Sequence, residues 1–157
     1  MYQIGDNIAY PMQGAGTITD IQHSESGEET ESYYILSLPF SKMNVMIPVS
    51  SSGKVGVRPV ISKDEIMQVM KTLGEETQPM PSNWNRRFRE NTEKLKTGDI
   101  YVVAGVVRDL VRSDRNKKLS TGENKLLNNA KQILESELVL AGGITLDEAE
   151  TMVMDHI

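Results

Sequence analysis

The chain has 157 residues, which is the length of one ordinary domain or two small ones. Its hydrophobic fraction of 38% and charged fraction of 25% are typical of folded globular proteins and exclude a disordered chain. Cysteine is absent, which excludes disulfides, thiolate nucleophiles and cysteine-based metal sites, and the net charge of −5 by itself argues against a nucleic-acid partner.

Short runs of β-forming residues, separated by turn residues, fill the first 60 positions. We expect a first strand before Pro11, a turn at Gly14-Ala15-Gly16 and a second strand around Ile18 and Ile21. A polar stretch then predicts a hairpin with its tip at Gly27. The remaining expected strands are Tyr33–Leu38, Met43–Val49 and a brief one at Val55–Val57. Short antiparallel strands at this spacing predict a small, strongly bent barrel of the SH3 or Tudor kind.

From Ser62 onward the apolar residues take helical spacing. Ser62 and Glu65 form a capping-box pattern that predicts a helix over 62–73, and two prolines then predict a linker over 74–81. Later helices are expected over about 82–96, from Ile100, from the capping box of Ser120 and Glu123 to Gly142-Gly143, and from Thr145 to the end. The predicted fold is therefore α+β, with a strand-rich domain over 1–60 and an all-helical bundle over 61–157.

Charge is distributed unevenly along this order of elements. Residues 1–80 carry a net charge of −5, residues 82–131 a net charge of +6, and residues 132–157 a net charge of −6, with His neutral. A basic segment between two acidic ones is typical of proteins with a polyanionic partner, although solvated helical faces produce the same pattern.

None of the usual catalytic or nucleotide-binding motifs is present in the sequence. Gly14-Ala15-Gly16 precedes no predicted helix, so we interpret it as a turn and not as a phosphate loop. The acidic pairs Glu28-Glu29 and Glu75-Glu76 fall in predicted exposed loops, and His23 and His156 lie near opposite ends of the chain. We expect neither catalytic residues nor a metal, a cofactor or a small-molecule substrate.

The segment Ser82–Arg89 concentrates Trp84 with three arginines and Phe88 at the start of a predicted helix. Helical spacing places Trp84, Arg87 and Phe88 on one side, while Arg86 and Arg89 project elsewhere. One interpretation is an aromatic pair packed into the bundle with arginines on its rim. The other is a basic helix end that meets phosphates, with an aromatic ring available to stack on a base or to wedge between base steps.

Other charged residues of the basic segment fall into two groups. Lys125, together with Lys94, Lys96, Lys117, Lys118 and Lys131, is expected to extend a positively charged patch. The charges from Arg108 to Arg115 are expected to form ion pairs along one helix, each worth only about 0.3–0.5 kcal/mol (Arg108, Asp109, Arg112, Asp114, Arg115).

Taken in order, these motifs strongly resemble the CarD/CdnL family of bacterial transcription regulators that bind RNA polymerase. The resemblance runs almost from end to end of the chain, and only the combination is specific. The matching residues are Ile4-Gly5-Asp6, Tyr10-Pro11-Met12-Gln13-Gly14, Pro48, Val55-Gly56-Val57-Arg58, Asn83-Trp84-Asn85-Arg86-Arg87-Phe88, Glu93-Lys94-Leu95, Gly98-Asp99, Val106-Val107-Arg108-Asp109-Leu110 and Leu119-Ser120-Thr121-Gly122-Glu123.

The resemblance implies that the Tudor-like domain docks on the β subunit of RNA polymerase, by edge-strand pairing at Val45, Met46, Ile47 and Pro48. It also implies that the helical domain contacts double-stranded promoter DNA at the upstream edge of the bubble. Trp84 is then the minor-groove wedge, with phosphate contacts from Arg86, Arg87 and Arg89. Better-known relatives carry arginines in the polymerase-facing strands, whereas this chain has Met46 and, near the hairpin, His23-Ser24.

Two functions are consistent with these residues. The first is a non-enzymatic, cytoplasmic transcription regulator that stabilises the open complex and is associated with the nucleoid through RNA polymerase. The second is a protein–protein adaptor that docks on polymerase or a related partner without touching DNA, in which Trp84 belongs to the core. Exposure of the indole distinguishes them, because a wedge must be accessible. No membrane partner is expected: apolar runs stay well short of a spanning helix, and Met1–Asp6 does not resemble a secretory signal.

Overall fold

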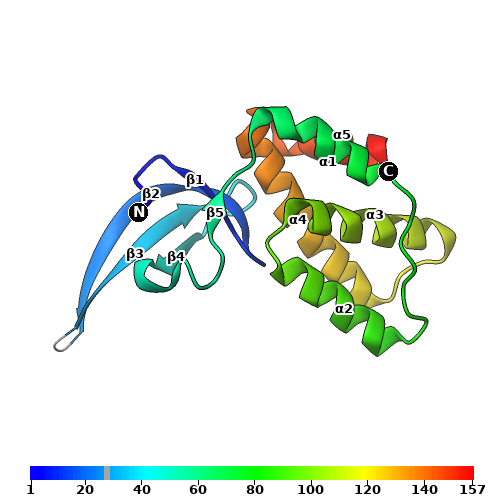
Figure 1. The fold of residues 1–157 in the computed structure, drawn as a ribbon, viewed down its shortest axis with the longest axis horizontal. Coiled ribbons are helices and arrows are strands. Elements are labelled where there is room, and N and C mark those ends of the chain that lie inside the picture. The colour runs from blue at the N-terminus through cyan, green and yellow to red at the C-terminus, as the bar shows by residue number, and fades with distance from the viewer. Residues whose placement is uncertain (27–28) are drawn as a thin grey trace.

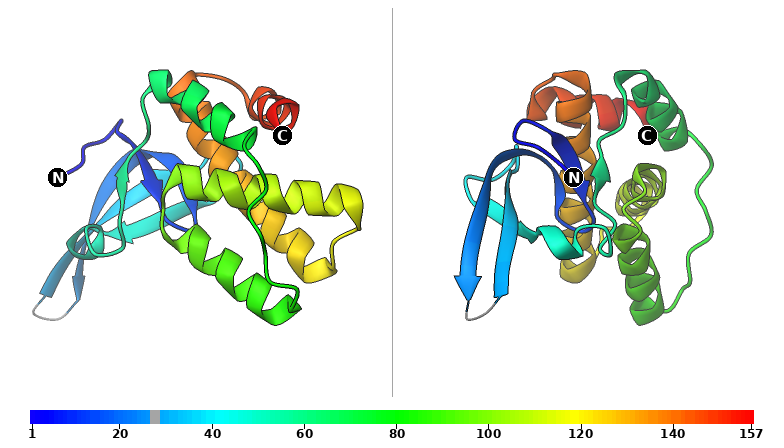
Figure 2. Two further views of the ribbon diagram at one scale, coloured as in Figure 1. Left: turned by 45° about the vertical axis from the view of Figure 1, so that its right-hand side comes forward. Right: turned by 60° about the vertical axis from the view of Figure 1, so that its left-hand side comes forward.

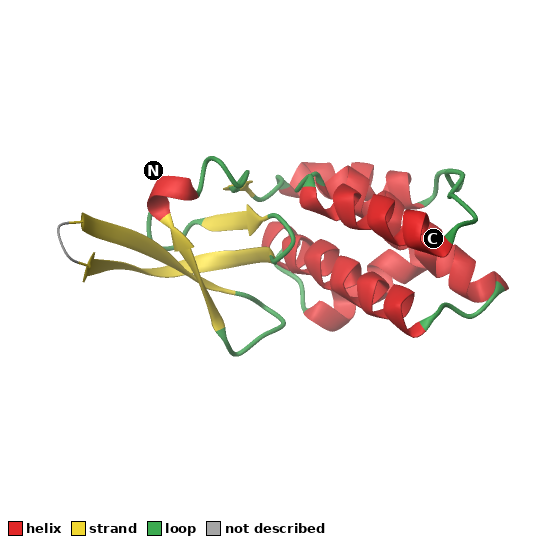
Figure 3. Ribbon diagram, turned by 90° about the horizontal axis from the view of Figure 1, so that it is seen from below, coloured by secondary structure: helices red, strands yellow, loops and turns green. Residues whose placement is uncertain are grey.

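The computed structural model describes residues 1–26 and 29–157 (Figure 1). The described strands lie within residues 7–59, and the described α-helices follow within residues 66–156. Figure 3 shows the strands gathered at one end of the molecule and the α-helices at the other. The predicted α+β class, with strands first and helices second, is confirmed.

One antiparallel sheet contains the strands, in the order β4-β3-β2-β1-β5. The pairing of β2 with β3 is shifted between Ile18 and Asp20, which is a β-bulge and bends the sheet. Ile8, Ile18 and Leu36 are fully buried and form the centre of this domain's core. The bounds are Asn7–Tyr10 for β1, Gly14–Ser26 for β2, Glu29–Ser37 for β3, Asn44–Pro48 for β4 and Arg58–Pro59 for β5.

The turn predicted at Gly14-Ala15-Gly16 is wrong, because these residues form the first part of β2. The turn lies just before them, at residues 11–13, and places Met12 at a φ of 70°. Gly16 is needed for close strand packing, since a Cβ there would lie 2.5 Å from the Ser37 carbonyl oxygen. The short last strand is Arg58–Pro59 and not Val55–Val57, because Gly56 turns the chain with a φ of 84°. The expected hairpin tip at Gly27 lies outside the described residues.

The α-helices begin and end close to the predicted positions. They are α1 (Ile66–Leu73), α2 (Trp84–Lys96), α3 (Ile100–Asn116), α4 (Thr121–Gly142) and α5 (Leu146–His156). Thr145 and Glu148 form the complete capping box predicted for α5, and Gly143 ends α4 in the left-handed region. The box predicted at Ser62 and Glu65 does not form; a short 3₁₀ turn, Lys63–Glu65, leads into α1 instead.

Of the ion pairs expected within α3, Arg108–Asp109 forms, but it is buried, and the other arginines bond mainly to backbone carbonyls. Arg108 and Asp109 are buried and bond to each other at 2.8 Å, and Arg108 also donates to the Thr72 carbonyl oxygen at 2.8 Å. Arg112 donates to the Glu75 carbonyl oxygen at 2.6 Å, and Arg115 donates to that of Ile157. These arginines therefore bind the end of α1, the residues just after it and the last residue of the chain to α3. They satisfy carbonyls at the end of α1 that have no partner within that helix.

Helix α4 connects the two domains. Figure 2 shows it between the strands and the remaining helices. Its apolar side packs into the helical core through Leu134 and Leu138, which are fully buried. Toward the sheet, the Ser136 hydroxyl accepts a buried hydrogen bond of 2.9 Å from the backbone N–H of Ala15. One helix thus belongs to the bundle and to the contact with β2 at once.

A bidentate ion pair lies beside this contact. Arg58 of β5 donates to both carboxylate oxygens of Glu137 at 2.6 and 2.9 Å, and Glu137 also accepts the backbone N–H of Ile61 at 2.9 Å. The Nε–H of Arg58 donates to the Gly98 carbonyl oxygen at 2.9 Å. The Glu137 side chain is only 4% exposed, so removing its partner would leave a buried, unpaired charge. We call this group the Arg58–Glu137 latch.

A second carboxylate of α4 is buried without such a partner. Glu135 is 8% exposed, and its Oε1 has no hydrogen-bond partner among the described residues. Burial raises its pKa from 4.5 to about 7; the nearby Glu150 of α5 acts in the same direction, and Lys131 opposes it. Lys131 itself is paired with Glu150 at 3.2 Å.

The latch predicts a large loss of stability for Arg58→Ala, on the order of 3 kcal/mol in the free energy of unfolding, because Glu137 stays buried without its cation. Arg86→Ala is the matched control: the pair of Arg86 with Glu90 is exposed, so its loss should stay below about 0.5 kcal/mol. Urea unfolding of the two variants measures both values. Equal losses would contradict the structural role of the latch.

Glu135 predicts a pH-dependent stability. A folded-state pKa above the unfolded one stabilises the fold at pH values below about 4.5, and this contribution is lost as the pH rises through about 7. As the pH rises from 5 to 8, the free energy of unfolding of Glu135→Gln should therefore increase by on the order of 1–3 kcal/mol relative to that of wild type. Urea unfolding at both pH values tests this, with Asp155→Asn, an exposed carboxylate of α5, as the control. A constant difference between Glu135→Gln and wild type would show that Glu135 is ionised throughout.

Candidate functional site

Trp84 is the first residue of α2, and Asn83 caps this helix by accepting the backbone N–H of Arg86 at 3.0 Å. Trp84 is 44% exposed. It stacks on Phe88 with ring centroids 5.6 Å apart and an interplanar angle of 20°, as the helical spacing predicted. Its Nε1–H donates to the Ser120 hydroxyl of α4 at 3.0 Å. The ring is thus accessible on one part of its surface and held in place on another.

Arg87 is partly exposed and points toward the first turn of α4. Its guanidinium donates to both carboxylate oxygens of Glu123 at 2.7 and 2.9 Å, and to the carbonyl oxygens of Pro81 and Ser82. This hydrogen-bonded cation lowers the pKa of Glu123, whose side chain is 4% exposed. The Arg87 guanidinium is thus already occupied and is not free for the expected phosphate contact. Its N–H groups instead hold the linker before α2 to the first turn of α4.

The other expected contacts remain at the surface. Arg86 is exposed and makes an i,i+4 pair with Glu90 at 3.0 Å, which is weak in water and easily exchanged for a phosphate. Arg89 and Lys125 are exposed, and the ion pairs found among the described residues do not include them. Because Trp84 bonds to Ser120, the N-terminal ends of α2 and α4 lie together, and both carry partial positive charge.

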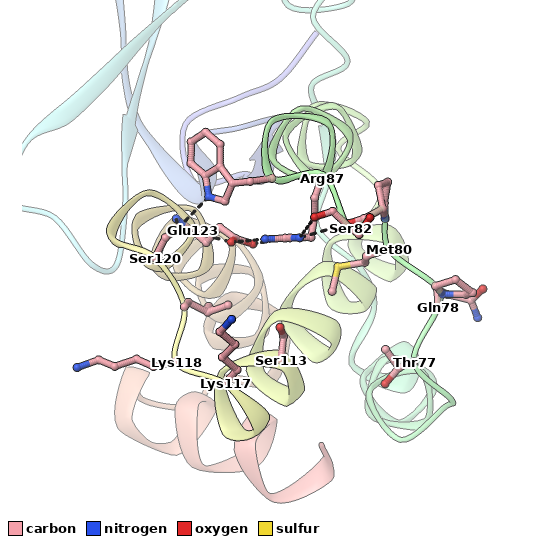
Figure 4. Close-up of a pocket in the computed structure, with 14 residues that line it drawn as sticks. Thr77, Gln78, Met80, Ser82, Arg87, Ser113, Lys117, Lys118, Ser120 and Glu123 are labelled. Carbon is pink, nitrogen blue, oxygen red and sulfur yellow. Dashed lines mark hydrogen bonds and ion pairs between the residues drawn. The ribbon is translucent and has the colours of Figure 1, made fainter.

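An open groove of about 780 Å³ lies beside this junction, between the linker and the N-terminal ends of α2 and α4. Figure 4 shows Arg87 and Glu123 facing each other in it, with Lys117 and Lys118 on the side nearest the end of α3. Both lysines are exposed. Their place in the predicted basic patch is consistent with the structure, since they lie at the same end of the bundle as Trp84.

Sequence patterns did not identify the contacts between α2 and α4. Ser120 and Glu123 were predicted as a capping box, and Ser120 does cap α4 by accepting the backbone N–H of Glu123 at 3.3 Å. Glu123 does not complete the box, because its carboxylate bonds to Arg87, 36 residues away in the sequence. What separates Glu123 from an ordinary capping residue is that its carboxylate is buried, and no local sequence pattern shows burial.

The residues predicted to contact polymerase lie on β4, an outer strand of the sheet. Met46 is 52% exposed, whereas Ile47 is fully buried and can offer a partner only its backbone. Val45 and Pro48 are half-buried. Met43, just before the strand, is 79% exposed and adds an apolar side chain that sequence analysis did not single out. An outer strand with exposed apolar side chains is suited to pairing with a strand of another protein.

Residues 1–26 and 29–157 contain no group of three or more His, Asp or Glu side chains that could hold a metal ion. Within the same part of the chain, no helix is both long and apolar enough to cross a membrane.

Comparison with known proteins gives matches along nearly the whole chain. Residues 2–61 match the CarD-like/TRCF RID domain, and residues 68–154 match the C-terminal domain of CarD. A protein of Bacillus subtilis (strain 168) named "Putative transcription factor YdeB" is 44% identical over 147 residues, which is 92% of this chain and 95% of that protein. These matches bear out the resemblance found in the sequence, and they identify a transcription factor and not an enzyme. The chain belongs to the CarD/CdnL family.

Proposed function

We propose that this CarD-like transcription factor binds the β subunit of RNA polymerase through β4 and promoter DNA through the joined N-terminal ends of α2 and α4. In this proposal it acts in the cytoplasm, at the nucleoid, and stabilises the open complex by placing Trp84 as a wedge at the upstream edge of the bubble. The observation that carries the proposal is Trp84, which is 44% exposed yet fixed by Phe88 and Ser120.

A wedge must be both exposed to the DNA and fixed in its orientation. Separating a base step requires a few kcal/mol, so the ring gains most where the duplex is already distorted, as at the edge of a bubble. A freely rotating side chain would also lose conformational entropy when inserted, whereas a fixed ring does not. The partial exposure of Trp84 favours this function over an adaptor, in which the indole would be a fully buried core residue.

Exposed cations beside Trp84 supply the attraction to the DNA backbone. Arg86 and Arg89 on α2 and Lys125 on α4 are all exposed, and the adjoining helix ends add partial positive charge. Arg87 is left out of this set because its donors are occupied. The same arrangement explains how a protein with a net charge of −5 approaches DNA, since residues 82–131 carry a net charge of +6 and the excess of acidic residues lies before and after them.

Docking on polymerase would compensate for weak binding to DNA. The match to the CarD-like/TRCF RID domain over residues 2–61 indicates a partner in the transcription machinery. A protein bound there presents Trp84 to the bubble at a high effective concentration, so the DNA contact can be weak in isolation and still be occupied in the complex.

Trp84→Ala should shorten the lifetime of the open complex about tenfold, because the unstacked base step loses a contact worth on the order of 1–2 kcal/mol. Binding to polymerase should be unchanged, since β4 lies in the other domain. A promoter-lifetime assay with competitor challenge gives the rate, and co-purification gives polymerase binding. Met67→Ala, which removes another exposed apolar side chain of the helical domain, is the matched control. A Trp84→Ala lifetime equal to wild type would contradict the wedge.

Arg86→Gln with Arg89→Gln should weaken binding to duplex DNA and make it less dependent on salt. Each phosphate contact contributes about −0.9 to the slope of log K against log salt, so the double variant should lose up to about 2 from the slope. Fluorescence anisotropy over a salt series measures this. Lys42→Gln with Lys54→Gln removes two exposed cations of the strand domain and should leave the slope intact. Parent binding that does not respond to salt would exclude phosphate contacts.

A further inference from the structure

The first turn of α4 contacts the Trp84 indole and its helix through three residues. The Ser120 hydroxyl accepts the indole Nε1–H at 3.0 Å. Gly122 lies beside the benzene part of the ring, where a Cβ would come within 3.3 Å of Cζ2 and 3.9 Å of Cη2. Glu123 binds Arg87, which is three residues after Trp84 on α2. These contacts act on the indole nitrogen, on the benzene part of the ring and on the helix that carries it.

Gly122 is unusual for its position. It lies in the first turn of α4. In a helix interior glycine is about 1 kcal/mol less favourable than alanine. A contact of 3.3 Å to the position of a Cβ is tighter than most real Cβ contacts, so alanine would require the indole to shift by a few tenths of an ångström. The glycine therefore gives up helix stability in exchange for close approach of the ring.

The Arg87–Glu123 pair fixes the two helices against each other. Glu123 is 3% exposed, and a buried carboxylate is tolerated only when its charge is paired and hydrogen-bonded. Two parallel N–H···O bonds set the angle as well as the distance between the groups they join. The N-terminal turn of α2, and with it the Cα of Trp84, is thereby placed relative to Ser120.

We propose that Ser120, Gly122 and Glu123 are positioning residues, which hold the Trp84 indole in the one orientation in which it acts as a wedge. This inference rests on the proposed function of Trp84. It adds that the ring is oriented before DNA arrives, so that little side-chain entropy is lost on insertion. Glu123 acts through Arg87, Ser120 through the indole N–H, and Gly122 through the space it leaves open.

Ser120→Gly tests the proposal, because glycine at an N-cap reduces helix stability by only a few tenths of a kcal/mol while it removes the acceptor for the indole. Ser120→Thr keeps a hydroxyl and should restore wild-type behaviour. Gly122→Ala is the second variant, and alanine favours the helix, so its folding is not in question. The urea midpoint of each variant checks stability.

Two readouts are needed. Trp84 is the only tryptophan of the chain, so acrylamide quenching of its fluorescence reports the indole alone in the free protein. Ser120→Gly and Gly122→Ala should each raise the quenching constant about twofold and shorten the open-complex lifetime several-fold, approaching Trp84→Ala. Ser120→Thr should match wild type in both measurements.

The failures are separable. If Trp84→Ala shortens the lifetime but Ser120→Gly and Gly122→Ala do not, the wedge stands and the positioning role is wrong. Unchanged quenching in these two variants, or a Ser120→Thr variant that behaves like Ser120→Gly, also overturns the positioning role. If Trp84→Ala has no effect on the lifetime, the proposed function itself fails.

Discussion

Two bidentate ion pairs on helix α4 determine how the parts of this protein are placed. Glu137 binds Arg58 of the strand domain, and Glu123 binds Arg87 of the helix that carries Trp84. Each carboxylate is 4% exposed at its side chain, so neither pair can open without leaving a buried charge. The two glutamates are separated by 14 positions on one continuous helix, or about 21 Å at 1.5 Å per residue. A rigid element of known length therefore joins the two domains.

This rigidity matters for a protein that must reach two partners at once. A flexible linker between a polymerase-binding strand and a DNA-binding helix would spread Trp84 over many positions and lower its effective concentration at the bubble. Here the latch holds the sheet to the C-terminal half of α4, and Ser120 holds the indole at its N-terminal end. The distance between β4 and Trp84, which the proposed function requires, is thus fixed by the fold.

Local signals carried much of the prediction from sequence. The change from strand to helical spacing, the caps at Ser120 and Thr145 and the glycine end of α4 depend on neighbours within a few residues, and all were found correctly. The local errors were small shifts, at the turn before β2, at the short last strand and at the start of α1. The errors that affect the candidate site concern contacts between distant residues. Glu123 meets Arg87 across 36 positions, and Arg108 meets the carbonyl of Thr72 across another 36. No periodicity distinguishes an arginine that is exposed from one that is buried against a carbonyl. Trp84 itself was identified, but its partners on α4 were not. Ser120 and Glu123 match a capping pattern, and this pattern does not show that they also contact Trp84 and Arg87.

In the proposed function, Trp84 enters the DNA at the upstream edge of the bubble. The most direct measurement places 2-aminopurine, a base whose fluorescence reports stacking, at successive positions across that edge in open complexes formed with polymerase. Wild-type protein should change the fluorescence at one or two adjacent positions, whereas Trp84→Ala, bound equally well to polymerase, should not. Identical fluorescence profiles for wild type and Trp84→Ala at every position would contradict the wedge.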